Sequence, residues 1–74
     1  MEYAIKHSYQ AFRRFCRSER MLIARDAYAS AGQIRLTPIS KQGNPQPGAE
    51  LVIAVDSIDA LIAALIAERD RTPV

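Results

Sequence analysis

The sequence is poor in the residues that build disulfides and metal sites. Its 74 residues include one Cys, one His and no Trp. A single Cys excludes an intramolecular disulfide, and one Cys with one His supplies too few ligands for a structural zinc ion. We therefore expect a fold that is stabilised without a disulfide, a metal or another cofactor.

Long apolar stretches are also scarce. The longest spans residues 58–67, contains Asp59 and has about half the roughly 20 residues that a membrane-spanning helix needs. Residues 1–6 lack the apolar segment of a secretory signal. These two absences predict a cytoplasmic protein without a membrane partner.

Residues for catalysis are few. His7 and Cys16 are nine positions apart, which on a single helix places them on opposite sides. The sequence has no Gly-rich phosphate loop and no acidic pair in a pocket-forming pattern. Cys16 fits a small buried apolar residue better than a nucleophile. The sequence thus indicates that the protein is not an enzyme.

What the sequence does contain is positive charge in its first half. Residues 1–37 carry seven Lys or Arg and three Asp or Glu, a net charge of +4, whereas residues 38–74 have a net charge of −2. Eight of the ten basic residues are Arg, whose planar guanidinium group suits carboxylates and phosphates. This asymmetry indicates an acidic partner for the first half, or two copies that meet head to tail.

Apolar residues in the first half recur at helical spacing and predict a helix over residues 8–31. Ser8 would cap its start, and Gly32 would end it. The pattern places Phe12 and Phe15 in the core rather than at a stacking surface. The apolar side consists of Tyr9, Phe12, Cys16, Ile23 and Ala27, with Phe15 and Leu22 flanking it.

The same expected helix carries a cluster of arginines on an arc of about 80° to 220° from Phe12 on an ideal wheel. The partner-binding residues predicted there are Arg13, Arg14, Arg17, Arg20, Arg25 and Tyr28. Guanidinium groups so close together repel each other, which favours a docking surface over a solvated face screened by the acidic half. The expected secondary contacts are Lys6, Arg35 and Lys41.

This basic helix suggests a small regulatory or inhibitory protein that binds an acidic surface of a protein target. The first alternative is a dimeric regulator that binds DNA or RNA through the same helix. A net charge of only +2 and the lack of RNP, GxxG or zinc-finger motifs weigh against it. The second alternative is a purely structural homo-oligomer.

The second half of the chain predicts an antiparallel hairpin. Its strands are residues 33–39 and 50–55, joined by a flexible loop at 40–49 that is rich in Pro and Gly. Pro38 cannot donate a ladder hydrogen bond, so the first of these strands lies at an edge or ends there. The second strand is almost wholly apolar, which predicts burial on both faces.

A final helix is expected after the hairpin, capped by Asp56 or Ser57, with a frayed tail at residues 72–74. Its Ile and Leu side chains form one face and its Ala side chains the other. Because 74 residues make only a marginal core, we expect a homodimer that uses the Ala face; the alternative is that Ala is simply a good helix former. The predicted interface residues are Ala60, Ala64 and Ala67.

Together these elements predict a single α+β domain over residues 1–74. The expected order is β-α-β-β-α, in which residues 2–7 form the first strand or instead extend the first helix. The hairpin 33–39/50–55 would pack with the two helices as an open-faced sandwich.

Overall fold

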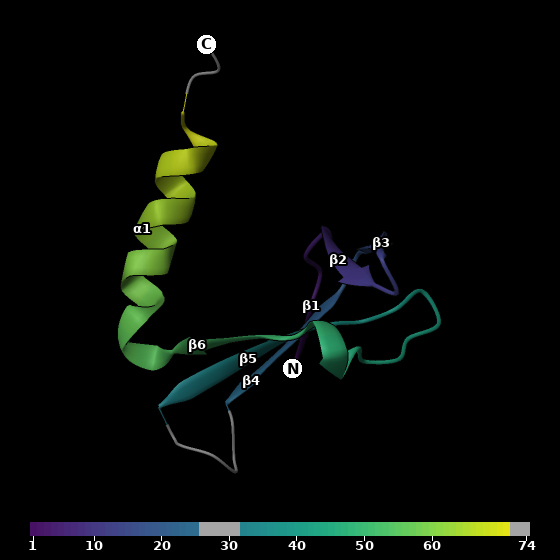
Figure 1. Ribbon diagram of the computed structural model, residues 1–74. Helices are drawn as coiled ribbons and strands as arrows, with labels where there is room; N and C mark the ends of the chain where they lie inside the picture. The colour runs from purple at the N-terminus through teal and green to yellow at the C-terminus, as the bar shows by residue number, and fades with distance from the viewer. Residues whose placement is uncertain (26–31, 72–74) are drawn as a thin grey trace.

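The computed structural model describes residues 1–25 and 32–71. It contains two antiparallel sheets, one of four strands in the order β1-β4-β5-β6 and one formed by β2 and β3 (Figure 1). The elements are β1 (Glu2–Tyr3), β2 (His7–Ala11), β3 (Arg14–Ser18), β4 (Met21–Arg25), β5 (Gln33–Pro38), the 3-10 helix η1 (Pro47–Ala49), β6 (Leu51–Ala54), the 3-10 helix η2 (Val55–Ser57) and α1 (Ile58–Arg69).

The hairpin predicted in the second half is confirmed. β5 pairs antiparallel with β6, so that Gln33 lies opposite Ala54 and Leu36 opposite Leu51. β5 ends at Pro38, as expected for a residue without an N–H, although it lies inside the sheet between β4 and β6. The final helix is confirmed as α1, with Ser57 at its N-cap position. The predicted capping by a side chain is wrong, because Ser57 makes no capping hydrogen bond.

The helix predicted over residues 8–31 is wrong: the described part of this segment forms β2, β3 and β4. These strands have five residues each and are joined by two-residue links, so their central residues recur every seven positions. Tyr9, Cys16 and Ile23 are those central residues. A spacing of seven residues equals about two helical turns. The recurrence of apolar residues at the centres of these short strands therefore matched the pattern expected of a helix. Among the described residues α1 is the only α-helix, so the two-helix sandwich is also wrong.

The turn between β2 and β3 lacks the residues that normally signal a hairpin. Its two residues, Phe12 and Arg13, have positive φ angles of 51° and 67°, and Ala11 pairs with Arg14 across the turn. This is the geometry of a type I′ turn, which normally selects Asn-Gly. Bulky residues in the left-handed region cost on the order of 1 kcal/mol each, so the turn stores conformational strain.

Replacing Arg13 by Gly is expected to stabilise the fold by about 1 kcal/mol, because Gly adopts positive φ without a Cβ clash. For a domain of this size the midpoint of thermal unfolding should rise by about 4–8 °C, as measured by circular dichroism. Arg14→Gly is the matched control, since Arg14 begins β3 without a positive φ angle, and Gly at that position should not raise the midpoint. A lower unfolding midpoint for Arg13→Gly than for the unmodified protein would contradict the claim that Arg13 strains the turn.

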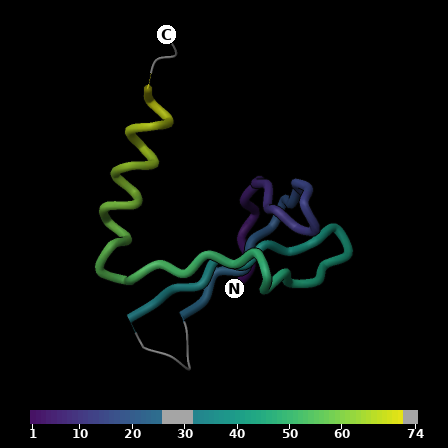
Figure 2. Tube along the Cα trace, viewed as in Figure 1, coloured from purple at the N-terminus to yellow at the C-terminus, as the bar shows by residue number. Residues whose placement is uncertain are grey.

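The single chain buries very little apolar surface. Apart from Pro38, the buried apolar residues in the described part of the chain are Tyr9 and Ile39, and Ile39 is 2% exposed. The predicted burial of residues 50–55 on both faces is wrong for one chain, because Leu51 is 57% exposed. α1 likewise contains no buried residue, and it leaves the end of β6 and points away from the strands (Figure 2). Within the described residues, no helix combines the length and the apolar character needed to cross a bilayer.

Candidate functional site

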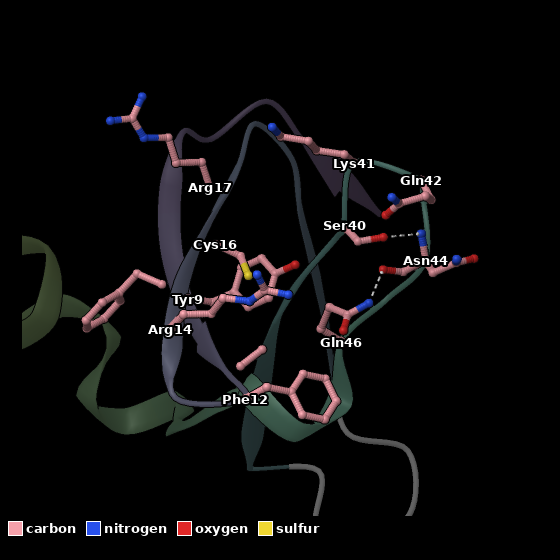
Figure 3. A pocket seen from close by; sticks show the side chains of 12 residues that line it. Tyr9, Phe12, Arg14, Cys16, Arg17, Ser40, Lys41, Gln42, Asn44 and Gln46 are labelled. Atoms are coloured by element: carbon pink, nitrogen blue, oxygen red, sulfur yellow. Dashed lines mark hydrogen bonds between the residues drawn. The ribbon is translucent and has the colours of Figure 1, made fainter.

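A basic hollow lies between the β2–β3 hairpin and the start of the loop that joins β5 to β6. We refer to it as the hairpin–loop groove. The hairpin contributes Tyr9, Ala11, Phe12, Arg14, Phe15, Cys16 and Arg17, and the loop contributes Ser40, Lys41, Gln42, Asn44 and Gln46 (Figure 3).

Local hydrogen bonds shape the loop wall of this groove. The Asn44 N–H donates to Ser40 Oγ at 3.2 Å, and the Ser40 N–H donates to the Asn44 carbonyl at 2.9 Å. Gly43 closes the turn between them with a φ of 89°, a conformation that favours glycine. The Gln46 side chain donates to the Asn44 carbonyl at 3.1 Å. The loop is thus folded upon itself and presents polar groups to the groove.

Ser18 attaches the hairpin to this loop. Its hydroxyl oxygen lies within hydrogen-bond distance of the carbonyl oxygens of Arg20, at 2.8 Å, and of Ile39. The Ile39 N–H also donates to the Arg20 carbonyl at 3.3 Å. Since Ser18 ends β3 and Ile39 follows β5, these contacts set the position of the hairpin relative to the four-stranded sheet.

The groove carries positive charge without a compensating carboxylate among its described lining residues, since Arg14, Arg17 and Lys41 are its only ionic groups at neutral pH. Arg14 lies opposite Ala11 on the inner face of the hairpin, and Arg17 lies opposite Ser8 on the outer face. Figure 3 accordingly shows Arg14 pointing into the groove and Arg17 pointing away from it.

Tyr9 forms the floor of the groove opposite Cys16. Burial raises the pKa of the Tyr9 phenol above its ordinary value of 10.0, and the neighbouring Cys16 adds to the rise. The phenol is therefore neutral at physiological pH and leaves the positive charge of the groove intact.

Two phenylalanines at the hairpin tip are the feature that the sequence pattern missed. Phe12 is 94% exposed and Phe15 is 76% exposed, whereas helical spacing had placed both in the core. Phe12 occupies the turn, and Phe15 lies opposite Gln10 on the outer face of β3. The sequence contained one signal for this exposure, the neighbouring Arg13, Arg14 and Arg17. In a strand, Phe15 and Arg17 lie on the same face, and a face that carries Arg17 is expected to be exposed to solvent.

The predicted basic cluster is only partly brought together. Arg13, Arg14 and Arg17 lie on the hairpin, and Lys41 faces them from the loop. The exposed Arg20 forms an ion pair with Glu2 at 3.2 Å and lines a neighbouring hollow with Arg17 and Lys41.

Of the other four residues predicted to contact a partner, three lie away from the hairpin–loop groove and one lies outside the described residues. Arg25 ends β4, and Arg35 pairs with Glu50 across the four-stranded sheet. Lys6 is exposed between β1 and β2, and Tyr28 lies outside the described residues. The single helical arc that was to unite these residues with the arginines therefore does not form.

His7 and Cys16 also lie differently from expectation. Both face the inner side of the hairpin, His7 opposite Ser18 and Cys16 opposite Tyr9, rather than opposite sides of a helix. His7 Nδ1 is 2.8 Å from the Ile5 carbonyl oxygen. Its buried Nε2 has no hydrogen-bond partner among the described residues. The two residues thus share a face but occupy different rungs of the ladder.

The α1 residues predicted at a dimer interface, Ala60, Ala64 and Ala67, are all exposed in the single chain. Comparison with protein-family models, with curated proteins and with solved structures finds no match to this chain.

Proposed function

We propose that the protein binds single-stranded nucleic acid on the β2–β3 hairpin and the hairpin–loop groove. The observation that carries this proposal is the exposure of Phe12 and Phe15 beside three arginines, Arg13, Arg14 and Arg17. Exposed aromatic rings alternating with cations are the elements with which proteins bind single strands.

Each part of the site has a distinct role in this proposal. The rings of Phe12 and Phe15 stack on two bases, which contributes about 1–3 kcal/mol per base without selecting a sequence. The arginines and Lys41 neutralise backbone phosphates and release counterions. The amide groups of Gln42, Asn44 and Gln46 supply donors and acceptors for base edges or sugar hydroxyls.

An acidic protein surface is the competing partner for the same residues, as in the regulatory or inhibitory protein first expected from the sequence. Binding energy at protein interfaces concentrates in a central cluster of anchors that fill pockets. Here Phe12 lies at the tip and Phe15 on the outer face of β3, so the two rings are spread along the hairpin. Spread rings suit successive bases, and this favours the nucleic acid.

Fluorescence anisotropy with labelled single-stranded DNA, single-stranded RNA, duplex DNA and poly-glutamate tests the proposal. With four cations at phosphates, the expected slope of log K against log salt is about −3, so affinity for the single strands should fall roughly 50-fold between about 50 and 200 mM salt. Poly-glutamate should bind at least tenfold more weakly than the single strands. Equal or tighter binding of poly-glutamate, or no binding of the single strands at the lower salt, would overturn the proposal.

The reversal Arg13→Glu with Arg17→Glu tests the placement of the site. It should lower affinity for the single strand by on the order of a hundredfold and reduce the salt slope by about half. The matched control is Arg69→Glu with Arg71→Glu, which changes the net charge equally but at the far end of α1. If both double variants lose the same affinity, net charge rather than the hairpin governs binding.

A further inference from the structure

One chain leaves far more surface exposed than a folded monomer of its mass. Its accessible surface is 6167 Å² for 8.2 kDa, whereas a monomer of this mass is expected to expose about 4,500 Å². The radius of gyration is 13.7 Å, against about 11 Å for a compact domain of this length. Roughly 1,600 Å² of each chain is therefore available for burial in an assembly.

Part of this surface is one face of the four-stranded sheet. Strand register places its apolar residues together: Tyr3 beside Met21, Ile23 beside Leu36, and Ile34 beside Ile53. None of these six side chains is buried, and at the β6 edge of the same face Leu51 is more than half exposed. Arg25, which pairs with Ile34, also lies on this face. The opposite face is mixed, because Thr37 and Arg35 lie there beside Leu22, Ala24 and Val52. The β2–β3 hairpin and η1 cover part of the apolar face, where His7 and Tyr9 line a hollow together with Met21, Leu36 and Leu51. The remainder of the apolar face has no cover among the described residues.

The other exposed apolar surface is α1, which is apolar on nearly every side between its first and last turns. Its Ile and Leu face includes Leu65, which is 60% exposed, and its opposite side is formed by alanines. A helix that is apolar all round belongs inside a protein. A single neighbouring surface covers only one of its two sides.

We propose that a second copy of this chain covers both the apolar sheet face and the exposed sides of α1. The Ile and Leu face of each α1 packs on the apolar sheet face of the other copy, and the alanine sides of the two α1 helices pack against each other in antiparallel orientation. A two-fold axis then passes near the middle of each helix, close to Ala64.

The dimensions of the two surfaces agree with this arrangement. The 12 residues of α1 span about 18 Å at 1.5 Å per residue, and four strands about 4.8 Å apart span about 14–19 Å. Burial of the excess surface of two chains amounts to about 3,200 Å², which lies within the 2,000–5,000 Å² of obligate dimers. Alanine allows close helix approach, and antiparallel helices align their dipoles favourably.

This dimer differs from a homo-oligomer held by oppositely charged halves, because its interface is apolar. It is also separate from the proposed nucleic-acid site, since Phe12, Phe15 and Arg17 take no part in it. Failure of one proposal therefore leaves the other standing.

Light scattering coupled to size-exclusion chromatography tests the dimer in the full chain. The expected mass is twice the 8.2 kDa of one chain, unchanged between low and high salt. A monomer mass for the unmodified protein, or dissociation by salt alone, would overturn the proposal.

Leu65→Glu tests the Ile and Leu face, with Phe15→Glu as the control that introduces the same charge at an exposed apolar residue of the hairpin. Leu65→Glu should abolish the dimer mass and Phe15→Glu should retain it. Loss of folding in Leu65→Glu also supports the proposal, because Glu at a position 60% exposed in one chain is tolerated unless another copy covers it. A dimer of normal mass for Leu65→Glu overturns it.

A disulfide tests the alanine side independently of any destabilising change. In a Cys16→Ser background, Ala64→Cys should form an intermolecular disulfide in most chains under mild oxidation, because residues near the axis approach their own copies. Lys41→Cys, exposed on the loop, should not. Equal cross-linking of the two variants would exclude the antiparallel helix pair.

Discussion

Replacing Phe12 and Phe15 together by Ala is expected to weaken the binding of a single-stranded oligonucleotide by on the order of a hundredfold. Each ring that stacks on a base contributes about 1–3 kcal/mol, and about 1.4 kcal/mol corresponds to a factor of ten. Both rings project into solvent, so their removal leaves the fold in place. Anisotropy titration measures the affinity, and circular dichroism verifies the fold.

Two further substitutions separate stacking from general apolar contact. Phe12→Tyr with Phe15→Tyr keeps both planar rings and should retain affinity within about threefold. Phe12→Leu with Phe15→Leu keeps apolar area but loses the rings, and should bind nearly as weakly as the Ala variant. If the double Leu variant binds the oligonucleotide with full affinity, the phenylalanines act as apolar anchors, as they would for a protein partner, and do not stack on bases.

Replacing Ile39 by Ala is expected to lower the free energy of unfolding by about 2–5 kcal/mol, since it opens a cavity at the most deeply buried side chain. Small domains have only about 5–15 kcal/mol in total. The backbone of Ile39 also joins the β3 end to the loop through Ser18 and Arg20, so distortion there would open the groove. Chemical denaturation followed by circular dichroism gives the free energy.

Two variants calibrate this effect. Ile39→Val removes one methylene group and should cost about 0.5–1.5 kcal/mol. Phe12→Ala removes a larger apolar side chain from an exposed turn and should change stability by less than about 0.5 kcal/mol. If Ile39→Ala costs no more than Phe12→Ala, the small core seen in one chain does not govern stability.

The second half of the fold was predictable because its signals are local. The apolar run of β6, Pro38 at the end of β5 and Ser57 before α1 each report a boundary that neighbouring residues determine. The first half was not predictable, because its strands are short and its turn lacks Gly and Asn. A seven-residue recurrence then matches strand centres and helical turns equally well.

The candidate site was predicted in its residue types but not in its geometry. Charge alone identified Arg13, Arg14 and Arg17, and it also selected Arg35, which the fold pairs with Glu50. Exposure of Phe12 depends on a turn whose φ angles contradict the preferences of its residues. A sequence pattern cannot reveal a residue that is held against its own preference by the surrounding ladder.

The outer edge of β6 has a consequence for how the protein behaves at high concentration. β6 is the last strand of its sheet, and residues 51–55 carry neither charge nor proline. A strand of this composition with a free row of N–H and C=O groups is a template for edge-to-edge aggregation. Conditions that partly unfold the chain therefore favour fibrous or amorphous precipitates that begin at this edge.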